Sequence, residues 1–196
     1  MHNDLALKIN TEVSGAQATA HIAEVGDSSI AVDSAHILKI CECLKNDGFN
    51  VLQTISGVDY PGEEAGTDGH IELNYILADF HEDRELILKT NVRRGTAEKL
   101  GTIASVVGVW KAADWQEREC YDMLGVHFLN HPDLRRILCP DDWEGFPLRK
   151  DYVVAEKYRD MTINPADKMN FYDREFFAKQ KAVDKAAKQA AASAGE

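Results

Sequence analysis

Apolar and polar residues alternate in two stretches near the middle of the chain, and this alternation predicts two β-strands. The alternating apolar side chains are Ile71, Leu73, Tyr75 and Leu77 in the first stretch and Leu86, Leu88 and Val92 in the second. Successive side chains of a strand point to opposite faces of its sheet, so each stretch turns one apolar face toward a core. The polar residues 79–84 between them suffice for a hairpin but not for the crossover that a parallel pair needs. The sheet is therefore expected to be mainly antiparallel.

Two further segments have the pattern of extended chain. Residues 20–32 form two short runs around Gly26 and Asp27, which indicates a hairpin. Residues 51–60 are rich in β-branched side chains and predict another strand, whereas residues 61–69 carry turn-forming residues without apolar periodicity. We interpret the latter as a loop between strands.

Apolar residues recur at spacings of three and four in residues 34–46, which predicts a helix. The stripe consists of Ile37, Leu38, Cys41 and Leu44. Asp33 and Ser34 are residue types that cap helix N-termini, and Gly48 is a natural stop after the C-terminus. The helix therefore has a start, an apolar face and an end in the sequence.

Two more helices are expected after the strands. A weaker helical pattern begins at Thr96, and a stronger one spans residues 112–124, where Trp115, Glu119 or Cys120, and Met123 stand about one turn apart. Together these elements predict an α+β fold in which a mainly antiparallel sheet packs with two to three helices.

The pattern changes after Gly125, where prolines punctuate a charge-rich stretch that has no helical or strand period. Apolar residues are still scattered along it, namely Phe128, Leu134, Ile137, Leu138, Trp143, Phe146 and Tyr152. Such a stretch cannot build its own core and needs a surface to cover, and we favour a neighbouring protein over the chain's own sheet. The expected organisation is an α+β domain (1–125), an extended partner-binding strap (126–176) and a Lys/Ala-rich tail (177–196).

The charge and the apolar runs limit the classes of partner. The formal net charge of -11 disfavours binding to nucleic acid or to an anionic bilayer surface. The most apolar run, 103–110, is far shorter than the roughly 20 residues of a membrane span. Residues 1–10 alternate Leu5, Leu7 and Ile9 with other residues and lack the regions of a signal peptide, so we expect a protein of the reducing cytosol. Any membrane association is expected to go through partners.

The densest group of ionisable residues lies in 114–122. Arg118 stands four positions after Asp114 and four before Asp122, so a helix would bracket one cation with two anions. Carboxylates beside an arginine could serve acid–base chemistry, but this spacing is the one that stabilises a helix face, and we favour the structural interpretation.

A zinc site is the alternative interpretation of the same region. Its four candidate ligands are Cys120, His127, His131 and Cys139. The two histidines have a zinc-like spacing, but neither cysteine belongs to a C-x-x-C pair, and Pro132 biases the backbone away from the helix that would align them. Motifs for dinucleotides, phosphate loops, hydrolase nucleophiles and iron–sulfur clusters are missing from the sequence. We therefore expect no cofactor, metal or catalytic residue in this chain.

One stretch of sequence carries a specific family resemblance. The run 117–124 reads ERECYDML, His131 follows after six residues, and 132–138 reads PDLRRIL; 141–152 continues as DDWEGFPLRKDY. This text resembles the signature of the C subunit of the proton-pumping NADH-quinone oxidoreductase, complex I. The signature residues are Glu117, Arg118, Glu119, Asp122, His131, Pro132, Arg135, Arg136, Trp143, Pro147, Leu148, Arg149, Lys150, Asp151 and Tyr152. The chain departs from the family pattern at Asn130, where many members have glycine, and at Cys139.

The resemblance implies a non-catalytic, stand-alone subunit of the peripheral arm. It would pack against the large quinone-site subunit, near iron–sulfur subunits, on the cytoplasmic side of the cell membrane. FMN, the iron–sulfur clusters and quinone would belong to other subunits of the complex, which passes electrons from NADH to quinone. The alternatives are the equivalent subunit of a membrane-bound hydrogenase or another donor-specific complex, and, in a different class, an independent zinc-binding domain.

Overall fold

The structure is a computed structural model that describes residues 1–62, 69–96 and 99–164. The chain divides into two compact units, Met1–Tyr152 and Val153–Glu196. The predicted boundary after Gly125 is therefore wrong, because the first unit continues for the whole length of the family signature. The predicted tail, 177–196, lies outside the described residues.

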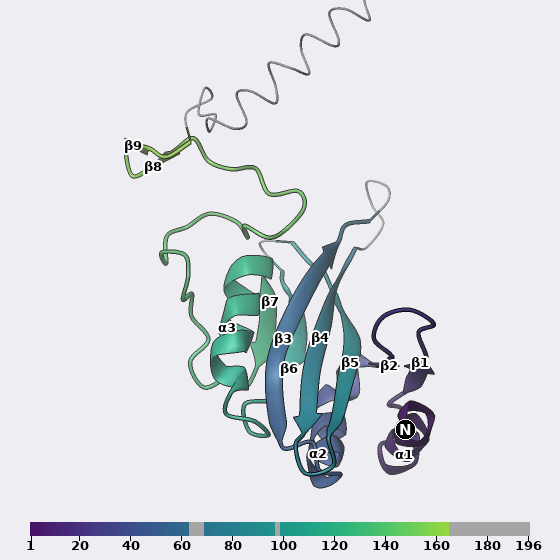
Figure 1. Cartoon of the computed structure of the whole chain (residues 1–196). Helices are drawn as coiled ribbons and strands as arrows, with labels where there is room; N and C mark the ends of the chain where they lie inside the picture. Colours follow the sequence, from purple (N-terminus) through teal and green to yellow (C-terminus); the bar gives the residue numbers. More distant parts are fainter. Residues whose placement is uncertain (63–68, 97–98, 165–196) are drawn as a thin grey trace, which may run out of the picture. The chain divides into compact units, whose positions relative to one another are not determined.

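A five-stranded sheet forms the centre of the first unit (Figure 1). Its order is β1-β2-β5-β4-β3, with bounds β1 (Thr19–His21), β2 (Ser29–Val32), β3 (Val51–Tyr60), β4 (His70–Asp79) and β5 (Arg84–Arg93). The β2–β5 pair is parallel and the other three pairs are antiparallel. The predicted hairpins β1–β2 and β4–β5 and the mainly antiparallel sheet of an α+β fold are confirmed.

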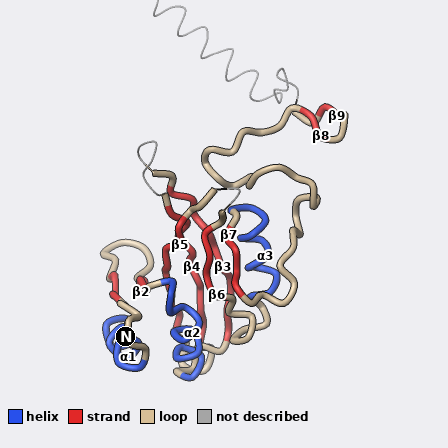
Figure 2. Tube along the Cα trace, turned by 180° about the vertical axis from the view of Figure 1, so that it is seen from behind, coloured by secondary structure: helices blue, strands red, loops and turns tan. Residues whose placement is uncertain are grey.

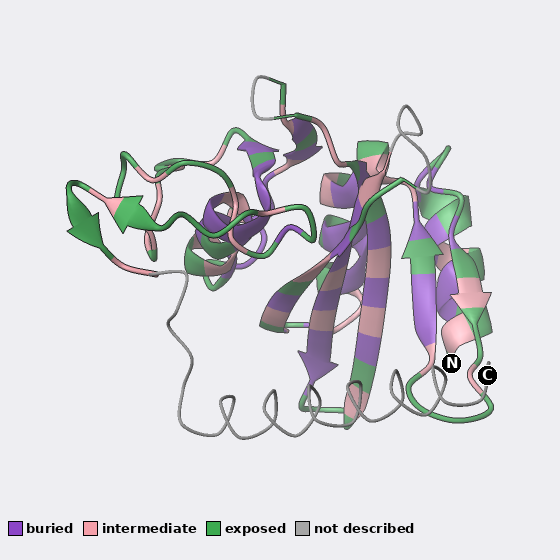
Figure 3. Cartoon of the chain, turned by 90° about the horizontal axis from the view of Figure 1, so that it is seen from above, coloured by how far each residue is buried: buried purple, intermediate pink, exposed green. Residues whose placement is uncertain are grey.

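One face of this sheet carries the core. The alternating apolar side chains of β4, Ile71, Leu73, Tyr75 and Leu77, are fully buried. Bands of buried and partly exposed residues accordingly alternate along the long strands (Figure 3). Helix α2 (Ile37–Asn46) covers this sheet on the side that faces the viewer in Figure 2. A short 3-10 turn, Ser34–His36, precedes α2, and the Asp33 carboxylate accepts the amide of Ala35 there. The capped helix expected over 34–46 is thus confirmed.

A helix at the amino terminus, α1 (His2–Glu12), is not anticipated by the sequence analysis. Leu5, Ile9 and Val13 are buried at a spacing of four, whereas Leu7 is exposed. The burial therefore follows a helical period and not the alternation of Leu5, Leu7 and Ile9. The Asn10 amide donates to the Ala18 carbonyl at 2.8 Å, and the Asn10 side-chain carbonyl accepts from the Ala18 amide at 2.7 Å. This pair of bonds occupies the backbone next to the short edge strand β1.

The helix predicted from Thr96 is wrong. The described part of this region instead contains β6 (Gly101–Ala104), which pairs in parallel with β7 (Val126–Leu129). A Cβ atom at Gly101 would lie 1.7 Å from the Arg93 carbonyl oxygen, so two backbone segments meet at this residue. Ile103 and Val106 are buried after it, and extended backbone lets these β-branched residues reach the core.

The strong helix predicted over 112–124 is confirmed as α3 (Ala113–Leu124), which ends at Gly125 with a φ of 73°. It lies along the edge strand β3 (Figure 1). Gln116 donates to the Gln53 carbonyl at 3.2 Å, and the Cys120 thiol lies 3.8 Å from the Ile55 carbonyl. An uncovered edge strand invites pairing with other chains, and α3 occupies that position here.

The described part of the second unit is a small hairpin. Strands β8 (Lys157–Tyr158) and β9 (Met161–Thr162) pair antiparallel. Arg159 and Asp160 between them both have positive φ values, 44° and 63°, as a two-residue type I′ turn requires. No helix in the described ranges is long and apolar enough to cross a bilayer.

The contact at Gly101 predicts a specific loss of stability. Gly101→Ala would force the Arg93 carbonyl and β6 apart, and we expect the free energy of unfolding to fall by about 3 kcal/mol in urea titrations of the whole chain. Gly108→Ala is the matched control, because a Cβ there meets no atom within 4 Å, and its change should stay below about 1 kcal/mol. Equal losses for the two variants would contradict the packing described here.

Candidate functional site

The family signature occupies α3 and residues 130–152. Residues 130–152 fold back against that helix, and we call them the α3-bound segment. Leu148 donates its amide to the Met123 carbonyl at 3.0 Å, and Arg136 and Arg149 also bond to the end of α3. We favoured a neighbouring protein over the chain's own domain as the surface that this stretch covers, but residues 130–152 bond to the chain's own helix. Arg136, Arg149 and the half-buried Phe146 find their contacts within the same unit, whereas Leu138, Leu148 and Arg135 are exposed.

Asp122 is the centre of this arrangement. One carboxylate oxygen accepts the amides of Ile137, Leu138 and Cys139 at 3.0, 2.7 and 2.8 Å. The other oxygen accepts from the Arg136 guanidinium at 2.6 Å. Asp122 is fully buried, and burial alone would raise its pKa. The three amides and Arg136 outweigh burial, so the pKa is lowered and the carboxylate stays charged.

Arg149 closes the C-terminal end of α3. Its guanidinium donates to the carbonyls of Leu124 at 2.7 Å, Arg94 at 3.0 Å and Gly95 at 3.2 Å. The last carbonyls of a helix lack partners within the helix, and a cation placed there also complements the helix dipole. The guanidinium lies 4.6 Å from the centre of the Phe146 ring, over which Arg136 is placed at 5.4 Å. One aromatic ring therefore connects the two buried arginine contacts.

A third contact ties the end of the α3-bound segment to the sheet. The buried Asp59 of β3 accepts from Arg94 at 2.6 Å and from the Lys150 amide at 2.8 Å. Arg94 also pairs with Asp151. Arg94 is a functional residue that the sequence analysis missed, since no local spacing links it to Asp59 or Asp151. The pKa of Asp59 is lowered, because Arg94 and the Lys150 amide outweigh the effect of burial.

The predicted double bracket around Arg118 is not formed. Arg118 instead donates to the Arg135 carbonyl at 3.3 Å, lies 4.0 Å from Asp133 and covers the Trp115 ring at 4.9 Å. Asp122 pairs with Arg136, and Asp114 faces His131. Opposite charges four positions apart pair on helix faces that are exposed to solvent. This face of α3 is instead covered by residues 130–152, which provide other partners for the charged residues of the helix.

Glu117 and His131 form a buried pair beside these contacts. His131 accepts the Asp133 amide on Nδ1 at 3.0 Å, so the proton of a neutral ring sits on Nε2, which donates to the Asp114 carbonyl at 3.1 Å. Glu117 accepts the Val106 amide at 2.7 Å, and its other oxygen is 4.0 Å from His131 Nε2. Burial raises the pKa of Glu117 to about 7, although bonds from Ser105 and Val106 oppose the shift.

The remaining signature residues divide into internal contacts and outward-facing positions. Trp143 donates to the Tyr152 hydroxyl at 3.1 Å, and Pro147 is half-buried. Glu119, Pro132, Arg135, Leu148, Lys150 and Asp151 are exposed, as are the neighbouring Trp115 and Leu138. Exposed members also take part in internal bonds, since Leu148 and Lys150 bond through their backbone amides and Asp151 pairs with Arg94.

The four candidate zinc ligands lie in different environments. Cys120 is buried against β3, where burial raises its thiol pKa to about 12, and His127 is exposed on β7. His131 is engaged with Asp114 and Asp133, and Cys139 lies beside Asp122. Within residues 1–62, 69–96 and 99–164, no three His, Cys, Asp or Glu side chains gather as metal ligands.

The sequence is similar to subunits of NADH dehydrogenases and NAD(P)H-quinone oxidoreductases. Residues 30–158 match the family described as respiratory-chain NADH dehydrogenase, 30 kDa subunit. The C subunit of NADH-quinone oxidoreductase from Chlorobium phaeobacteroides is 40% identical over 153 residues, which cover 70% of this chain and 87% of that protein. The J subunit of NAD(P)H-quinone oxidoreductase from Prochlorococcus marinus is 41% identical over 137 residues, covering 68% and 76%.

Two solved structures share the fold. A chain of the membrane-bound sulfane sulfur reductase, an archaeal respiratory membrane complex, has a TM-score of 0.64 at 22% identity, and the match covers 86% of this chain and 98% of that one. A trypsin-resistant fragment of Nqo5 has a TM-score of 0.55 at 21% identity, covering 68% of this chain and 100% of the fragment. The α+β architecture therefore occurs in solved structures as well.

The buried carboxylate of Asp122 predicts a large effect of its neutralisation. Asp122→Asn leaves Arg136 without its counter-charge and turns an amide group toward the same donors, so we expect the free energy of unfolding to fall by about 3 kcal/mol in urea titrations. Asp141→Asn, an exposed acid on the same segment, should change it by less than about 0.5 kcal/mol. A loss of similar size in both variants would show that Asp122 is not the anchor.

The raised pKa of Glu117 predicts a pH-dependent difference in stability. Between about pH 4.5 and 7 the folded chain keeps a proton on Glu117 that the unfolded chain releases, so the stability contributed by Glu117 falls as pH rises through this range. Glu117→Gln imitates the protonated acid and removes this dependence. Unfolding free energies at a series of pH values should shift in favour of the Gln variant by about 3 kcal/mol from pH 4.5 to 7.5. A difference that stays constant over this range would refute the assignment.

Proposed function

We propose that this chain, which belongs to the family of the 30 kDa subunit of respiratory-chain NADH dehydrogenase, is a non-catalytic subunit of the peripheral arm of an NADH-quinone oxidoreductase. The observation that carries the proposal is that signature residues form bonds within the chain. Asp122, Arg136 and Arg149 are engaged in internal bonds that fix the chain's course, which is the behaviour of a scaffold. The electron carriers, FMN and iron–sulfur clusters, would then be held by other subunits.

The cysteines support the proposal that other subunits hold the electron carriers. Cys41, Cys43 and Cys120 are buried, and burial raises the pKa of the Cys43 and Cys120 thiols to about 12. Iron–sulfur clusters are held by thiolates grouped around the metal, and the four cysteines, all within the described ranges, make no such group. The contribution of the chain is therefore to bind and position neighbouring subunits.

The outer surface of α3 and the α3-bound segment fits a protein partner. Exposed Leu138 and Leu148 lie close in sequence to the exposed cations Arg135 and Lys150, and Trp115 is exposed on α3. Aromatic and apolar anchors with arginine are the residues that interfaces prefer. We assign this surface to the large quinone-site subunit, so that the complex, and not this chain, meets the cytoplasmic side of the membrane.

Residues 153–164 supply a second contact of the predicted strap. Their hairpin has strands of two residues each, and Val153, Val154 and Met161 are 86%, 56% and 59% exposed. A hairpin this small is not stable in water by itself, and within residues 153–164 these side chains are not buried in a core. The partner-binding role expected for residues 126–176 is accordingly proposed here for residues 153–164 and the outer surface of residues 130–152.

Co-purification tests the function. A tagged chain expressed in its native cell and extracted with mild detergent should bring NADH-quinone oxidoreductase activity with it, together with flavin and iron–sulfur clusters in the other subunits. Recovery of the tagged chain alone, or with a complex that does not oxidise NADH, would refute the proposal. Iron, zinc and flavin analysis of the separately purified chain should find none in stoichiometric amount.

The hairpin prediction uses the same preparation. Replacing Val153 and Val154 by Asp places two charges on a surface that must lose water against the partner, so the recovered activity should drop at least about tenfold. Val25→Asp is the control, because Val25 is 94% exposed on the β1–β2 loop and should leave recovery unchanged. Undiminished recovery with the double variant would remove residues 153–164 from the interface while leaving the function intact.

A further inference from the structure

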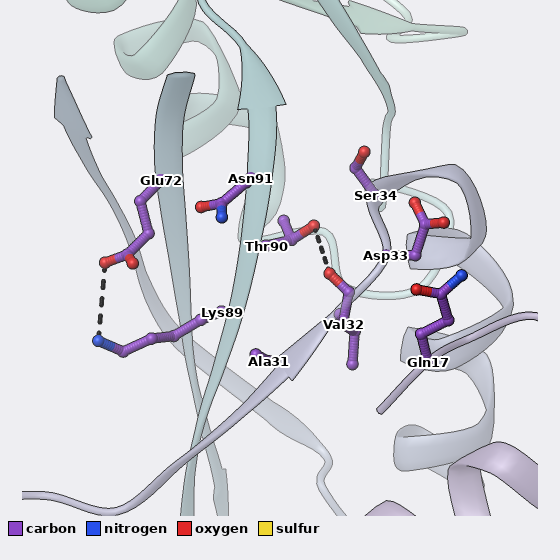
Figure 4. Close-up of a pocket in the computed structure, with 9 residues that line it drawn as sticks. All are labelled: Gln17, Ala31, Val32, Asp33, Ser34, Glu72, Lys89, Thr90 and Asn91. Carbon is purple, nitrogen blue, oxygen red and sulfur yellow. Dashed lines mark hydrogen bonds and ion pairs between the residues drawn. The ribbon is translucent and has the colours of Figure 1, made fainter. Parts of the chain in front are cut away.

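A pocket of about 360 Å³ opens where β2 ends beside β5 (Figure 4). Its polar lining comes from four parts of the chain: Gln17, Asp33, Ser34, Glu72, Lys89 and Asn91. None of these residues belongs to the signature, and the proposed function gives the pocket no role.

Hydrogen bonds within the chain fix the residues that line the pocket. The Asp33 amide donates to the Ala16 carbonyl at 3.0 Å, which ties the turn after α1 to the end of β2. Gln17 follows with a φ of 50°, a left-handed conformation that few side chains adopt. Thr90 donates to the Val32 carbonyl at 3.1 Å and closes the end of β2 against β5. The pocket is thus preformed.

The lining carries a surplus of hydrogen-bond acceptors and of negative charge. Its own cation, Lys89, lies 3.6 Å from Glu72 and is paired with it. Asp33 uses one carboxylate oxygen for the Ala35 amide, and no cation pairs with it in the described part of the chain. The hydroxyl of Ser34 and the side-chain amides of Gln17 and Asn91 have no hydrogen-bond partner among the described residues. One carboxylate and three neutral polar groups therefore remain for a ligand.

This chemistry selects a cation with several N–H donors. Anions are disfavoured, because Asp33 and Glu72 outnumber Lys89. A divalent metal would need more carboxylate ligands than the one that is unpaired. A guanidinium offers five donors in a planar fork and is the cationic group that interfaces prefer.

We propose that the pocket receives an arginine side chain of a neighbouring subunit, which pairs with Asp33 and donates to Ser34 and Gln17 beside it. This inference rests on the proposed function, because it requires that the chain has neighbours in a complex. It adds an interface on the β2–β5 side of the sheet, separate from the contacts on α3 and on residues 153–164.

Asp33→Asn is a sharp test, because asparagine also caps helices and can keep the bond to the Ala35 amide while it removes the charge. Asp27→Asn is the matched control, an exposed acid on the β1–β2 loop that loses the same charge outside the pocket. Tagged wild-type and variant chains in the intact complex are chased with untagged chain. We expect release of the Asp33→Asn chain to be on the order of tenfold faster than that of the other two.

Arginine footprinting with phenylglyoxal identifies the occupant in the same complexes. An arginine of a neighbouring subunit should be protected with wild type and Asp27→Asn and should react with Asp33→Asn. Equal release of all three chains, or the absence of any newly reactive arginine with Asp33→Asn, would overturn the proposal. A wild-type chain that is recovered in no complex would instead overturn the proposed function. Unfolding free energies of the free variants should agree, which separates weakened binding from weakened folding.

Discussion

The buried carboxylate of Asp122 fixes the path of the chain after α3. It accepts three successive amides of residues 137–139 and the guanidinium of Arg136, so a turn of irregular backbone is held on a helix face without secondary structure of its own. Buried backbone amides must find acceptors, and a carboxylate with four hydrogen bonds satisfies them while its own charge is neutralised. Without it, the α3-bound segment would lose both its acceptor and the partner of Arg136.

The other contacts depend on this anchor. With residues 137–139 in place, Phe146 lies under Arg136 and Arg149, and Arg149 can reach the last carbonyls of α3. Asp59 and Arg94 then fasten residues 150 and 151 to the sheet. Five of the fifteen signature residues are charged groups whose side chains bond to backbone atoms, namely Glu117, Arg118, Asp122, Arg136 and Arg149. The outward-facing remainder, including Arg135 and Lys150, belongs to the surface that we propose for a partner.

The regular elements could be predicted because their information is local. The alternation in β4 and β5, the apolar stripe of α2 and the stop at Gly125 each follow from neighbouring residues. The family resemblance also identified the segment that carries the site. The bonding within that site could not be predicted, since Asp122 and residues 137–139 meet only after the chain has turned back. Arg118 shows the same limit. Asp114 and Asp122, one helical turn away, were its expected partners, yet Arg118 contacts Asp133 and the Arg135 carbonyl instead. Helix α1 and strand β6 were missed where short apolar runs fit two periods.

The central claim is that residues 130–152 are part of the folded unit before any partner binds. Amide hydrogen exchange of the isolated chain tests it most directly. We expect the amides of Ile137, Leu138 and Cys139, which donate to Asp122, to exchange slowly, with protection approaching that of β4 and β5. Exchange of these three amides at the rate of unfolded peptide, with the sheet still protected, would contradict the account and show that a partner orders this segment.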